Sequence, residues 1–441
     1  MKAWREKSVL ALVPLIALSL SACGGNETSG KTGQEGKSAG TSAPKEVTLK
    51  IGLPGAYDIT KKEIIDGFQA KYPHIKLKID ESPWSDFSQK ITAQVAAGNP
   101  PDVWFQENAV ILGYGKRGAA ENLAPYIKRD LKQDDYNKGL FAAQTADGSV
   151  WGVPHGLNPA TLVYNKKLFA DNGIPAPTNN WTYQDMLDAA KKLTKDTNGD
   201  GKTDFYGFNV ASSITVGWFP WSKIYGGGIL DETKTKAIVT DPKTIQGLDK
   251  WVSVVKEGIS PTEDILKAGG GEAQMFGSGK IAMLFSQYSN QLIYAKNYPD
   301  LDYDAAPMPK GMDGKRVVPL VTNSWVVYSR ASQEVKDAAW QFLQYYLSDE
   351  AQETLAKSGN ALPVKKSAEA KLDPTTRPQN KKAYADGVAE AGTTTDENPS
   401  WQEWRLAAQP IFTEIYQQRK TPEQGAKEIQ EKIQAVLDKN K

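Results

Sequence analysis

The 441-residue sequence is short of the residues and motifs on which many enzymes and disulfide-bonded proteins depend. It has one cysteine, Cys23, so no disulfide can form within the chain. It has two histidines, His74 and His155, and no Gly-x-Ser-x-Gly, His-Glu-x-x-His or Walker motif. These absences argue against the enzyme classes built on such motifs. The 52 acidic residues leave a glycoside hydrolase open, because paired carboxylates suffice for that chemistry.

An excess of charge and a membrane-length apolar run are also missing. Lys and Arg number 53 against 52 Asp and Glu, which gives a formal net charge of +1. A nucleic-acid partner or a basic membrane surface needs a concentrated positive field, so we expect neither. The apolar run from Val9 to Leu20, interrupted by Pro14, is too short to span a bilayer.

The N-terminus has the features of an export signal. Positive residues at Lys2, Arg5 and Lys7 precede the apolar run, and small residues follow it. The tetrad Leu-Ser-Ala-Cys ending at Cys23 resembles the bacterial lipobox, which implies cleavage before Cys23 and a lipid on its thiol. We therefore expect a signal peptide over residues 1–22. Residues 23–46 are rich in Gly, Ser, Thr, Lys and Glu, and we expect a disordered tether there.

The length predicts two domains, and the folded part opens with an α/β pattern. Apolar alternation predicts strands over 47–52, 75–79 and 102–105, with amphipathic helices over 62–72 and 86–97 between them. This order is typical of a parallel sheet with helices on both faces. Ligands of such sheets bind at the carboxyl ends of the strands. The polar and aromatic residues expected at those ends are Tyr57, Asp58, Trp84, Glu107 and Asn108.

A second lobe is expected over 161–285, where strands and helices alternate again, with a strand over 205–208. Within it, the stretch from Gly217 to Gly228 gathers two Trp, a Phe and a Tyr next to a run of glycines. Taken alone, such a stretch is a buried core more often than a ligand surface. Trp and Tyr outnumber Phe in this chain, 30 to 12, and their polar edges suit amphipathic ligands, so both interpretations stay open.

At this point four segments together resemble a known family. The chain is similar to the extracellular solute-binding proteins of bacterial ABC importers, in the carbohydrate-binding group that includes maltose-binding protein. The order and spacing of the segments make the set specific. They are Ala97-Gly98-Asn99-Pro100-Pro101-Asp102-Val103, Leu162-Val163-Tyr164-Asn165-Lys166-Lys167-Leu168-Phe169, Gly277-Ser278-Gly279-Lys280-Ile281-Ala282-Met283 and Ala338-Ala339-Trp340-Gln341-Phe342-Leu343.

The resemblance implies a two-lobed type II periplasmic-binding-protein-like fold. Each lobe would be a mainly parallel sheet flanked by helices, with hinge crossovers between the lobes and the ligand in the cleft. The N-terminal lobe would comprise 47–153 and 317–360, and the C-terminal lobe 154–316 and 361–441. A monomer would hang from the outer face of a Gram-positive cell membrane by the lipid on Cys23, and present a carbohydrate to the transmembrane permease subunits.

The resemblance also implies site residues. Trp218 matches a stacking aromatic of the family, Trp221 lies one helical turn on, and Tyr288 follows Ser286 where the family has another stacking ring. Trp401 or Trp404 matches a third. Asn158 stands where the family has a hydroxyl-binding Glu. His155 lies in a hinge or cleft loop and would bond the ligand or serve a structural role. The full predicted set is Tyr57, Asp58, Trp84, Glu107, Asn108, His155, Asn158, Trp218, Trp221, Ser286, Tyr288, Asn323, Trp401 and Trp404.

One loop has the spacing of a calcium ligand set. Oxygen-bearing residues alternate from Asp196, with Gly201 at the sixth position, as in the start of an EF-hand loop. The twelfth position is Gly207 instead of a bidentate Glu, and an Asx-rich turn has the same composition. We expect at most one structural Ca²⁺ and no catalytic cofactor. The candidate ligands are the side chains of Asp196, Asn198, Asp200 and Asp204 and the carbonyl of Lys202.

Three functions follow for testing. The first is a lipid-anchored carbohydrate receptor of an ABC importer, with stacking for affinity and hydroxyl hydrogen bonds for specificity. The second is a surface glycoside hydrolase or lyase. The third is a binding protein for a non-sugar solute.

Overall fold

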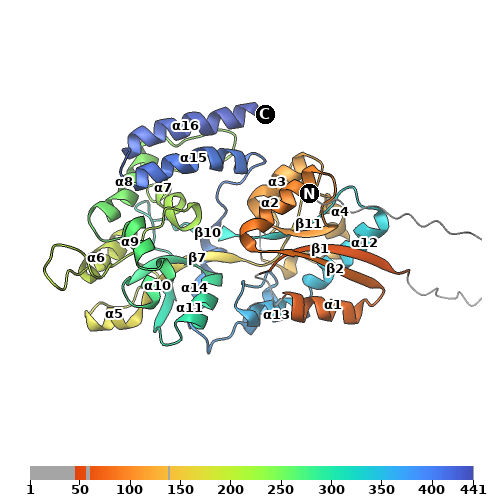
Figure 1. The fold of residues 1–441 in the computed structure, drawn as a ribbon, viewed down its shortest axis with the longest axis horizontal. Helices are drawn as coiled ribbons and strands as arrows, with labels where there is room; N and C mark the ends of the chain where they lie inside the picture. Colours follow the sequence, from red (N-terminus) through yellow and green to blue (C-terminus); the bar gives the residue numbers. More distant parts are fainter. Residues whose placement is uncertain (1–44, 56–59, 138–139, 441) are drawn as a thin grey trace, which may run out of the picture. The chain divides into compact units, whose positions relative to one another are not determined.

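Two β-sheets organise the computed structural model of this chain (Figure 1). The structure describes residues 45–55, 60–137 and 140–440. Residues from Lys45 onward form one compact unit. Within the described part, no helix is both long and apolar enough to cross a bilayer.

Several predicted features lie outside the described residues. These are the signal peptide over 1–22, residues 23–44 of the tether predicted over 23–46, with Cys23, and the loop residues Tyr57 and Asp58. The backbone of Trp84 is described, but its side chain is not.

The first sheet joins strands from three distant stretches of the chain. Its order is β2-β1-β3-β11-β6, in which β1, β2 and β3 run parallel and β11 runs antiparallel to β3 and to β6. The alternating residues Leu49, Ile51 and Leu53 of β1 are fully buried, as the sequence pattern predicts for a central strand. The strands are β1 (Val47–Pro54), β2 (Ile75–Ser82), β3 (Val103–Gln106), β6 (Val153–Pro154) and β11 (Ser324–Val327).

The second sheet is built around the long strand β7. Its order is β12-β10-β7-β8, with β9 also paired to β7. Strands β8, β9 and β10 all run antiparallel to β7, and the one parallel pair is β10 with β12. The prediction of a mainly parallel sheet in each lobe is therefore wrong for this lobe. The strands are β7 (Asn158–Asn165), β8 (Met283–Gln287), β9 (Tyr303–Ala306), β10 (Val318–Val321) and β12 (Gly392–Thr393). A separate two-stranded ribbon pairs β4 (Thr145–Ala146) with β5 (Ser149–Val150).

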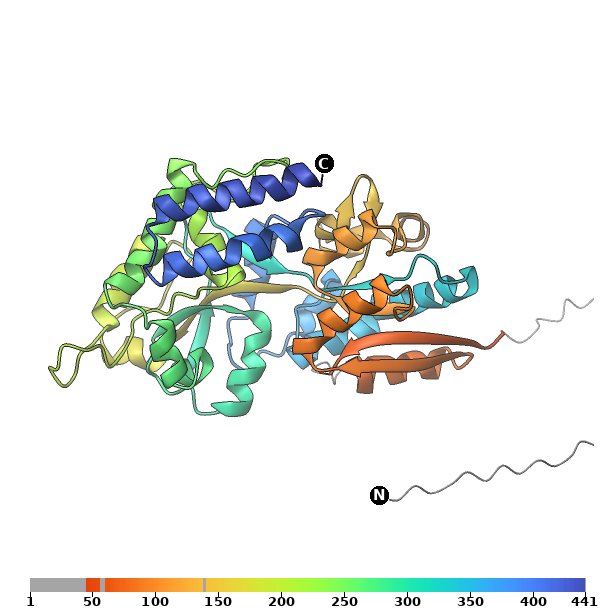
Figure 2. The same cartoon turned by 45° about the horizontal axis from the view of Figure 1, so that its top comes forward.

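Helices flank both sheets (Figures 1 and 2). Those before β7 are η1 (Thr60–Ile65), α1 (Asp66–Lys71), α2 (Trp84–Ala96), α3 (Asn108–Lys116), α4 (Ala124–Asp130), η2 (Gln133–Asp135) and η3 (Ala142–Gln144). Those from β7 to β9 are α5 (Lys166–Asp171), α6 (Tyr183–Leu193), η4 (Ile214–Trp218), α7 (Phe219–Ser222), α8 (Pro242–Lys256), α9 (Glu263–Ala268), α10 (Glu272–Gly277), η5 (Tyr288–Asn290) and α11 (Gln291–Asn297). The last are α12 (Gln333–Tyr346), α13 (Asp349–Ser358), η6 (Lys366–Lys371), α14 (Lys382–Ala391), α15 (Trp401–Tyr416) and α16 (Pro422–Lys439).

Among the described strands, the chain crosses between the two sheets three times. It leaves the first sheet between β6 and β7, returns between β10 and β11, and leaves it again between β11 and β12. Two boundaries differ from the prediction. Strand β10, placed by us in the N-terminal lobe, pairs with β7 in the second sheet. The segment 361–371, placed by us in the C-terminal lobe, stays beside the first sheet, because η6 packs on α13 and Lys365 pairs with Tyr136.

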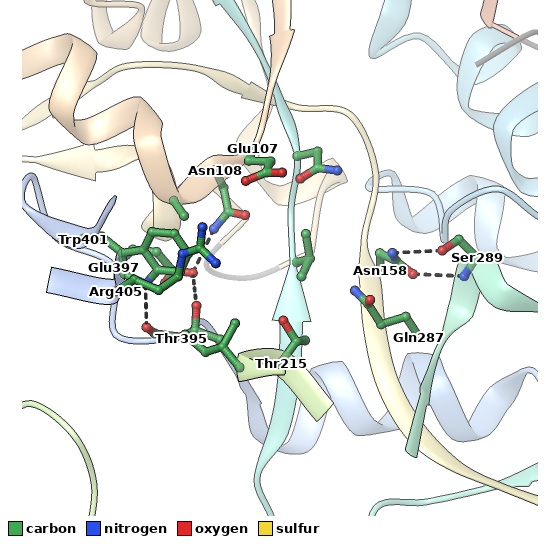
Figure 3. Close-up of a pocket in the computed structure, with 14 residues that line it drawn as sticks. Glu107, Asn108, Asn158, Thr215, Gln287, Ser289, Thr395, Glu397, Trp401 and Arg405 are labelled. Carbon is green, nitrogen blue, oxygen red and sulfur yellow. Dashed lines mark hydrogen bonds between the residues drawn. The ribbon is translucent and has the colours of Figure 1, made fainter. Parts of the chain in front are cut away.

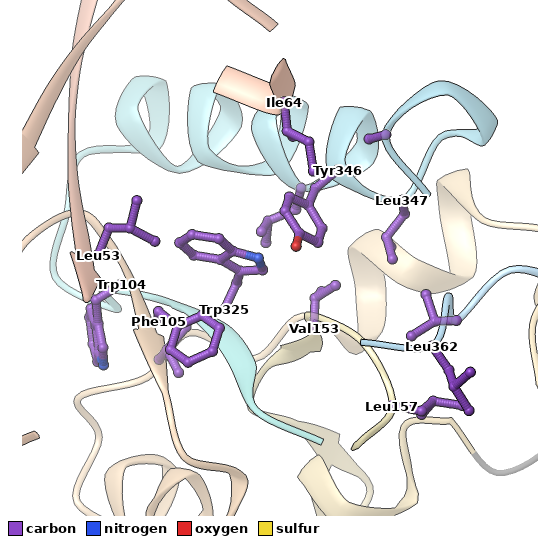
Figure 4. Packing of buried hydrophobic residues seen from close by; sticks show 14 of the residues in the cluster. Leu53, Ile64, Trp104, Phe105, Val153, Leu157, Trp325, Tyr346, Leu347 and Leu362 are labelled. Carbon is purple, nitrogen blue, oxygen red and sulfur yellow. The ribbon is translucent and has the colours of Figure 1, made fainter. Parts of the chain in front are cut away.

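An aromatic cluster behind the first sheet fixes the packing near the crossings (Figure 4). The Trp325 ring meets Phe105, Phe342 and Tyr346 edge to face, with centroid distances of 5.6, 5.3 and 5.4 Å. Such edge-to-face contacts add to the free energy of burial. Because Phe105, Trp325 and Tyr346 belong to β3, β11 and α12, the cluster ties early and late parts of the chain together.

The C-terminal helices form an antiparallel pair. Helices α15 and α16 lie side by side in Figures 1 and 2, and both pack against α8. The close approach depends on Gly425, where an added Cβ would lie 2.3 Å from Cδ1 of Ile415. A capping box of Thr421 and Gln424 begins α16. The pair therefore holds the start of α15 at a fixed place beside α3.

Candidate ligand-binding site

A cavity of about 400 Å³ lies where the two sheets meet (Figure 3). Its walls come from the end of β3 and the start of α3, from the crossing segments before β7 and before β11, and from elements around the second sheet. This is the place predicted for the ligand, at the carboxyl end of β3 and between the lobes. The lining residues are Glu107, Asn108, Ala109, Asn158, Ile214, Thr215, Gln287, Ser289, Val321, Asn323, Thr395, Glu397, Trp401 and Arg405.

The first wall is the turn from β3 into α3. The four residues of β3 are all buried, so the chain can present polar groups only after Gln106. Glu107 has extended backbone angles and precedes the first turn of α3, which begins at Asn108. Sequence reasoning treated these residues as a loop and did not predict α3. Glu107 and Asn108 both line the cavity, and their contact with a ligand stays a prediction.

A buried polar segment before α15 forms the second wall. Glu397 is 4% exposed, and its Oε1 accepts hydrogen bonds from Asn108 Nδ2 at 3.1 Å and from Thr395 Oγ1 at 2.8 Å. Its Oε2 is buried and has no hydrogen-bond partner among the described residues. A buried carboxylate oxygen of this kind favours a ligand that donates a hydrogen bond.

The aromatic surface of the cavity is Trp401. Its indole Nε1 donates to the carbonyl oxygen of Thr395 at 2.9 Å, and Trp404 meets its ring edge to face at 5.9 Å. The Arg405 guanidinium lies over the Trp401 ring, with Cζ 4.9 Å from the centroid. Trp401 is thus held in one orientation by its neighbours.

The cavity has an acidic and a basic side chain on different walls, Glu107 and Arg405. Burial raises the pKa of Glu107, and the Arg405 guanidinium opposes that rise. Burial likewise lowers the pKa of Arg405, and Glu107 opposes that fall. The two groups therefore stabilise each other's charged forms across the cavity.

The third wall comes from the second sheet. Asn158, at the start of β7, exchanges two hydrogen bonds with Ser289: Asn158 Nδ2 donates to Ser289 Oγ at 3.1 Å, and the Ser289 amide donates to Asn158 Oδ1 at 3.0 Å. Gln287 and Thr215 complete this wall (Figure 3). Of the predicted set, Glu107, Asn108, Asn158, Asn323 and Trp401 line the cavity.

The indoles predicted as a stacking floor lie in the core instead. Trp218 is 0% exposed and stacks on Phe412 of α15, with centroids 3.9 Å apart and an interplanar angle of 4°. Its Nε1 donates to Gln409 Oε1 at 3.3 Å. Trp221 is also 0% exposed and packs edge to face on Tyr183 at 5.0 Å. Neither ring lines the cavity, so the expectation that Trp218 and Trp221 form its stacking floor is wrong.

Four more predicted ligand contacts are buried away from the cavity. Tyr288 packs edge to face on Tyr384 at 5.2 Å, and Trp404 is 0% exposed behind Trp401. His155 pairs through Nδ1 with the Tyr346 hydroxyl in the aromatic cluster, and burial lowers its pKa to about 3. Ser286 is buried and accepts a hydrogen bond from Asn290 Nδ2. Their positions fit packing roles.

Sequence reasoning missed most of the segment before α15 and its first turn. Thr395, Glu397 and Arg405 line the cavity together with Gln287 and Ser289. A signal was present, because polar residues from Thr393 to Asn398 directly precede Trp401. This polar segment did not by itself predict a ligand site, because the same composition is typical of a surface loop.

In the loop predicted to bind calcium, the side-chain oxygens accept hydrogen bonds from backbone amides of the same loop. Asp196 accepts hydrogen bonds from the amides of Gly199 at 2.7 Å and Gly201 at 2.9 Å. Asp204 Oδ2 accepts from the amide and hydroxyl of Thr197, and Asn198 and Asp200 each accept from an amide two residues on. Among the described residues no group of three or more His, Cys, Asp or Glu is arranged to hold a metal. These residues, as placed, do not form a coordination set, and calcium binding by this loop, with Lys202 as a carbonyl ligand, stays a prediction.

Comparison with known proteins agrees with this geometry. The model of a family described as bacterial extracellular solute-binding protein matches residues 63–386. The diacetylchitobiose binding protein DasA of Streptomyces coelicolor is 25% identical over 445 residues, covering 96% of this chain and 97% of that protein. The galactooligosaccharide-binding protein of Bacillus subtilis is 24% identical over 325 residues, covering 72% of this chain and 70% of that protein.

A solved structure shows the same fold. An ABC substrate-binding protein from Listeria monocytogenes, in complex with cycloalternan, superimposes with a TM-score of 0.79 at 20% sequence identity, covering 89% of this chain and all of that one. The two-lobed type II fold predicted from the sequence is thereby confirmed. The family match covers well over half of the residues, and it agrees with the extracytoplasmic location that we expected. This chain belongs to the bacterial extracellular solute-binding proteins.

Proposed function

We propose that this protein captures a sugar or oligosaccharide in the cavity between its two sheets and presents it to the permease subunits of an ABC transporter. The observation that carries the proposal is the pairing of one oriented indole, Trp401, with polar side chains from three walls. An aromatic face suits the C–H face of a pyranose, and amide and carboxylate oxygens suit its hydroxyls. The relatives named for diacetylchitobiose and galactooligosaccharide support the same ligand class.

Intrinsic fluorescence titration tests the ligand class. The protein would be titrated with chitooligosaccharides, galactooligosaccharides and maltooligosaccharides, and with a polyamine and a peptide. We expect saturable binding to at least one sugar series and none to the other two solutes. Asn158→Ala should weaken sugar binding, while Asn297→Ala, on the exposed end of α11, should not. Binding to the polyamine or the peptide alone would reject the carbohydrate proposal.

We also propose that the ligand is bound without being cleaved. Glu107 and Glu397 line one cavity, so hydrolysis deserves a direct test. Each bound oligosaccharide would be incubated with the protein and examined by chromatography. We expect the full-length ligand to be recovered. Products that disappear in Glu397→Gln would instead favour a glycoside hydrolase.

For anchoring, we propose that Cys23 carries the lipid and that the mature monomer is tethered to the outer face of the membrane of a Gram-positive cell. The support is the order of positive residues, apolar run and lipobox-like tetrad in the sequence. Expressed with radiolabelled palmitate in a Gram-positive host, the chain should be labelled and membrane-bound. Cys23→Ala should be unlabelled, and a labelled Cys23→Ala protein would contradict the assignment.

A further inference from the structure

Arg405 covers the indole of Trp401, the one Trp ring among the described residues that lines the cavity. It lies one helical turn after Trp401 on α15, and its guanidinium Cζ is 4.9 Å from the centre of the Trp401 ring. Figure 3 shows the two side chains together, on the same side of the cavity as Glu397 and Thr395. With Arg405 in this position Trp401 is only 4% exposed. A pyranose and the guanidinium would compete for the same aromatic face.

Trp401 itself has little freedom to turn toward a ligand. Its Nε1 is bonded to the Thr395 carbonyl at 2.9 Å, and Trp404, fully buried, packs on it at 5.9 Å with an interplanar angle of 69°. Rotating the indole would break that hydrogen bond and disturb the core. Access to its face therefore depends on Arg405.

Arg405 is held less firmly. Among the described residues its guanidinium makes no hydrogen bond or ion pair, and its Nε is buried without a partner. The contact with the indole is a cation–π interaction, which is modest at a partly hydrated site. The opposite charge that acts on it across the cavity is that of Glu107, on the other lobe. A bidentate Arg–carboxylate pair would satisfy the guanidinium better than the indole does.

We propose that Arg405 is a displaceable cap, which the ligand removes from Trp401 and drives toward Glu107, so that the two charges pair across the cleft. The proposal rests on the proposed function, since the ligand must offer an apolar ring face. It adds a rule of specificity: only a solute whose C–H face can replace a guanidinium on the indole binds well. It also couples occupancy to closure, because Glu107 and Arg405 belong to opposite lobes.

The cap is tested first without any ligand. The protein would be labelled with 5-fluorotryptophan, and the ¹⁹F signal of Trp401 assigned with Trp401→Phe. We expect Arg405→Ala to shift that signal and to raise its H₂O/D₂O solvent isotope effect. Arg419→Ala, which removes an exposed arginine just after α15, should do neither. Arg405→Gln serves as the second variant if Arg405→Ala folds poorly. A Trp401 signal unchanged in both Arg405 variants would overturn the proposal.

The pairing with Glu107 is tested by a double-mutant cycle on sugar affinity. Glu107→Gln should weaken binding about tenfold in the otherwise unchanged protein, and less than about twofold when Arg405→Ala is already present. Glu431→Gln, an exposed acid on α16, is the charge-matched control. Additive effects would mean that each residue contacts the ligand independently, and would overturn the pairing. If no sugar binds the wild type, the proposed function fails, while the ligand-free fluorine spectra still decide whether Arg405 covers Trp401.

Discussion

Glu397 shows how one side chain can serve both the fold and the site. One carboxylate oxygen accepts hydrogen bonds from Asn108 and Thr395, and the other is buried beside the cavity without a partner among the described residues. The first oxygen joins the two lobes, and the second is available to a ligand. The two roles can be separated by substitution.

We predict that Glu397→Gln keeps the fold and loses ligand affinity. The amide oxygen can still accept from Asn108 and Thr395, so the free energy of unfolding should change by less than about 1 kcal/mol. The amide nitrogen would then face the ligand as a donor, and sugar affinity should fall about tenfold or more, the value of a hydrogen bond to a charged group. Urea unfolding and calorimetric titration measure the two effects. Equal affinity in both proteins would contradict the prediction.

His155 predicts how stability depends on pH. Burial beside Phe105 and Tyr346 lowers its pKa to about 3, whereas an unfolded histidine titrates near pH 6.5. Between these pH values His155 is protonated in the unfolded state and neutral in the folded state. The free energy of unfolding therefore decreases as pH falls from about 6.5 toward 3.

Between about pH 6.5 and pH 3, protonation at His155 should lower the free energy of unfolding by about 1.4 kcal/mol for each pH unit. His155→Gln removes the titrating group and retains a partner for the Tyr346 hydroxyl. Urea unfolding at about pH 7.5 and pH 5 should show a difference between the two pH values that is about 2 kcal/mol smaller in the variant. Parallel pH curves for variant and wild type would reject this account.

At the scale of elements, η4 and α15 are joined by the stack of Trp218 on Phe412. Both rings are 0% exposed, so truncation leaves a large cavity. We predict that Trp218→Ala lowers the free energy of unfolding by about 3–5 kcal/mol. The double variant with Phe412→Ala should lose less than the sum of the two single losses, because they remove one shared contact. Strict additivity, measured by urea unfolding, would argue against the stack.

The loop from Asp196 to Asp204 offers a prediction that separates a turn from a metal site. Asp196 accepts two amide hydrogen bonds within the loop. We predict that Asp196→Ala lowers the melting temperature slightly, and by the same amount in calcium and in EDTA. Asp188→Ala, on the exposed face of α6, is the charge-matched control. A loss confined to calcium-containing buffer would instead favour the ion.

The elements η4 and α15 show what could and could not be predicted from the sequence. Helical and strand periods gave the order of elements well, because each depends on near neighbours. Whether an indole lies in the core or at the surface depends on residues distant in the sequence. Trp218 packs on Phe412, and no residue near Trp218 in the sequence indicates that contact. Of the pair Trp401 and Trp404, only the packing of α15 decides which one faces the cavity. Strand 205–208 was predicted, but Phe205 and Tyr206 make only isolated bridges.

At the scale of the whole molecule, the site exists only when both sheets are formed. Glu107 and Asn108 follow β3, Asn158 begins β7, and Trp401 begins α15. The family likeness predicted this two-lobed arrangement. The predicted direction of strand pairing was wrong for the second sheet, because pairing with β7 joins residues over a hundred positions apart, whose partners the local pattern does not identify.

We predict that ligand stabilises both lobes in one step. A sugar at about a hundred times its Kd should raise the free energy of unfolding by about 2.7 kcal/mol. Far-ultraviolet circular dichroism and tryptophan fluorescence should report the same shifted midpoint in urea. The control is the same titration of Glu397→Gln, with a smaller shift at equal sugar concentration. Two separate transitions, of which only one responds to sugar, would contradict this expectation.

The antiparallel strand β11 has a consequence for how the protein is made. Strand β3 ends at Gln106, and its neighbour β11 begins at Ser324, so residues 107–323 must leave the ribosome before the first sheet can be completed. Pairing over such a distance is slow. A chain destined for export gains from that delay, because a secretory channel accepts an unfolded polypeptide. The order of the strands thus means that a nascent chain shorter than about Ser324 still lacks a strand of its first sheet.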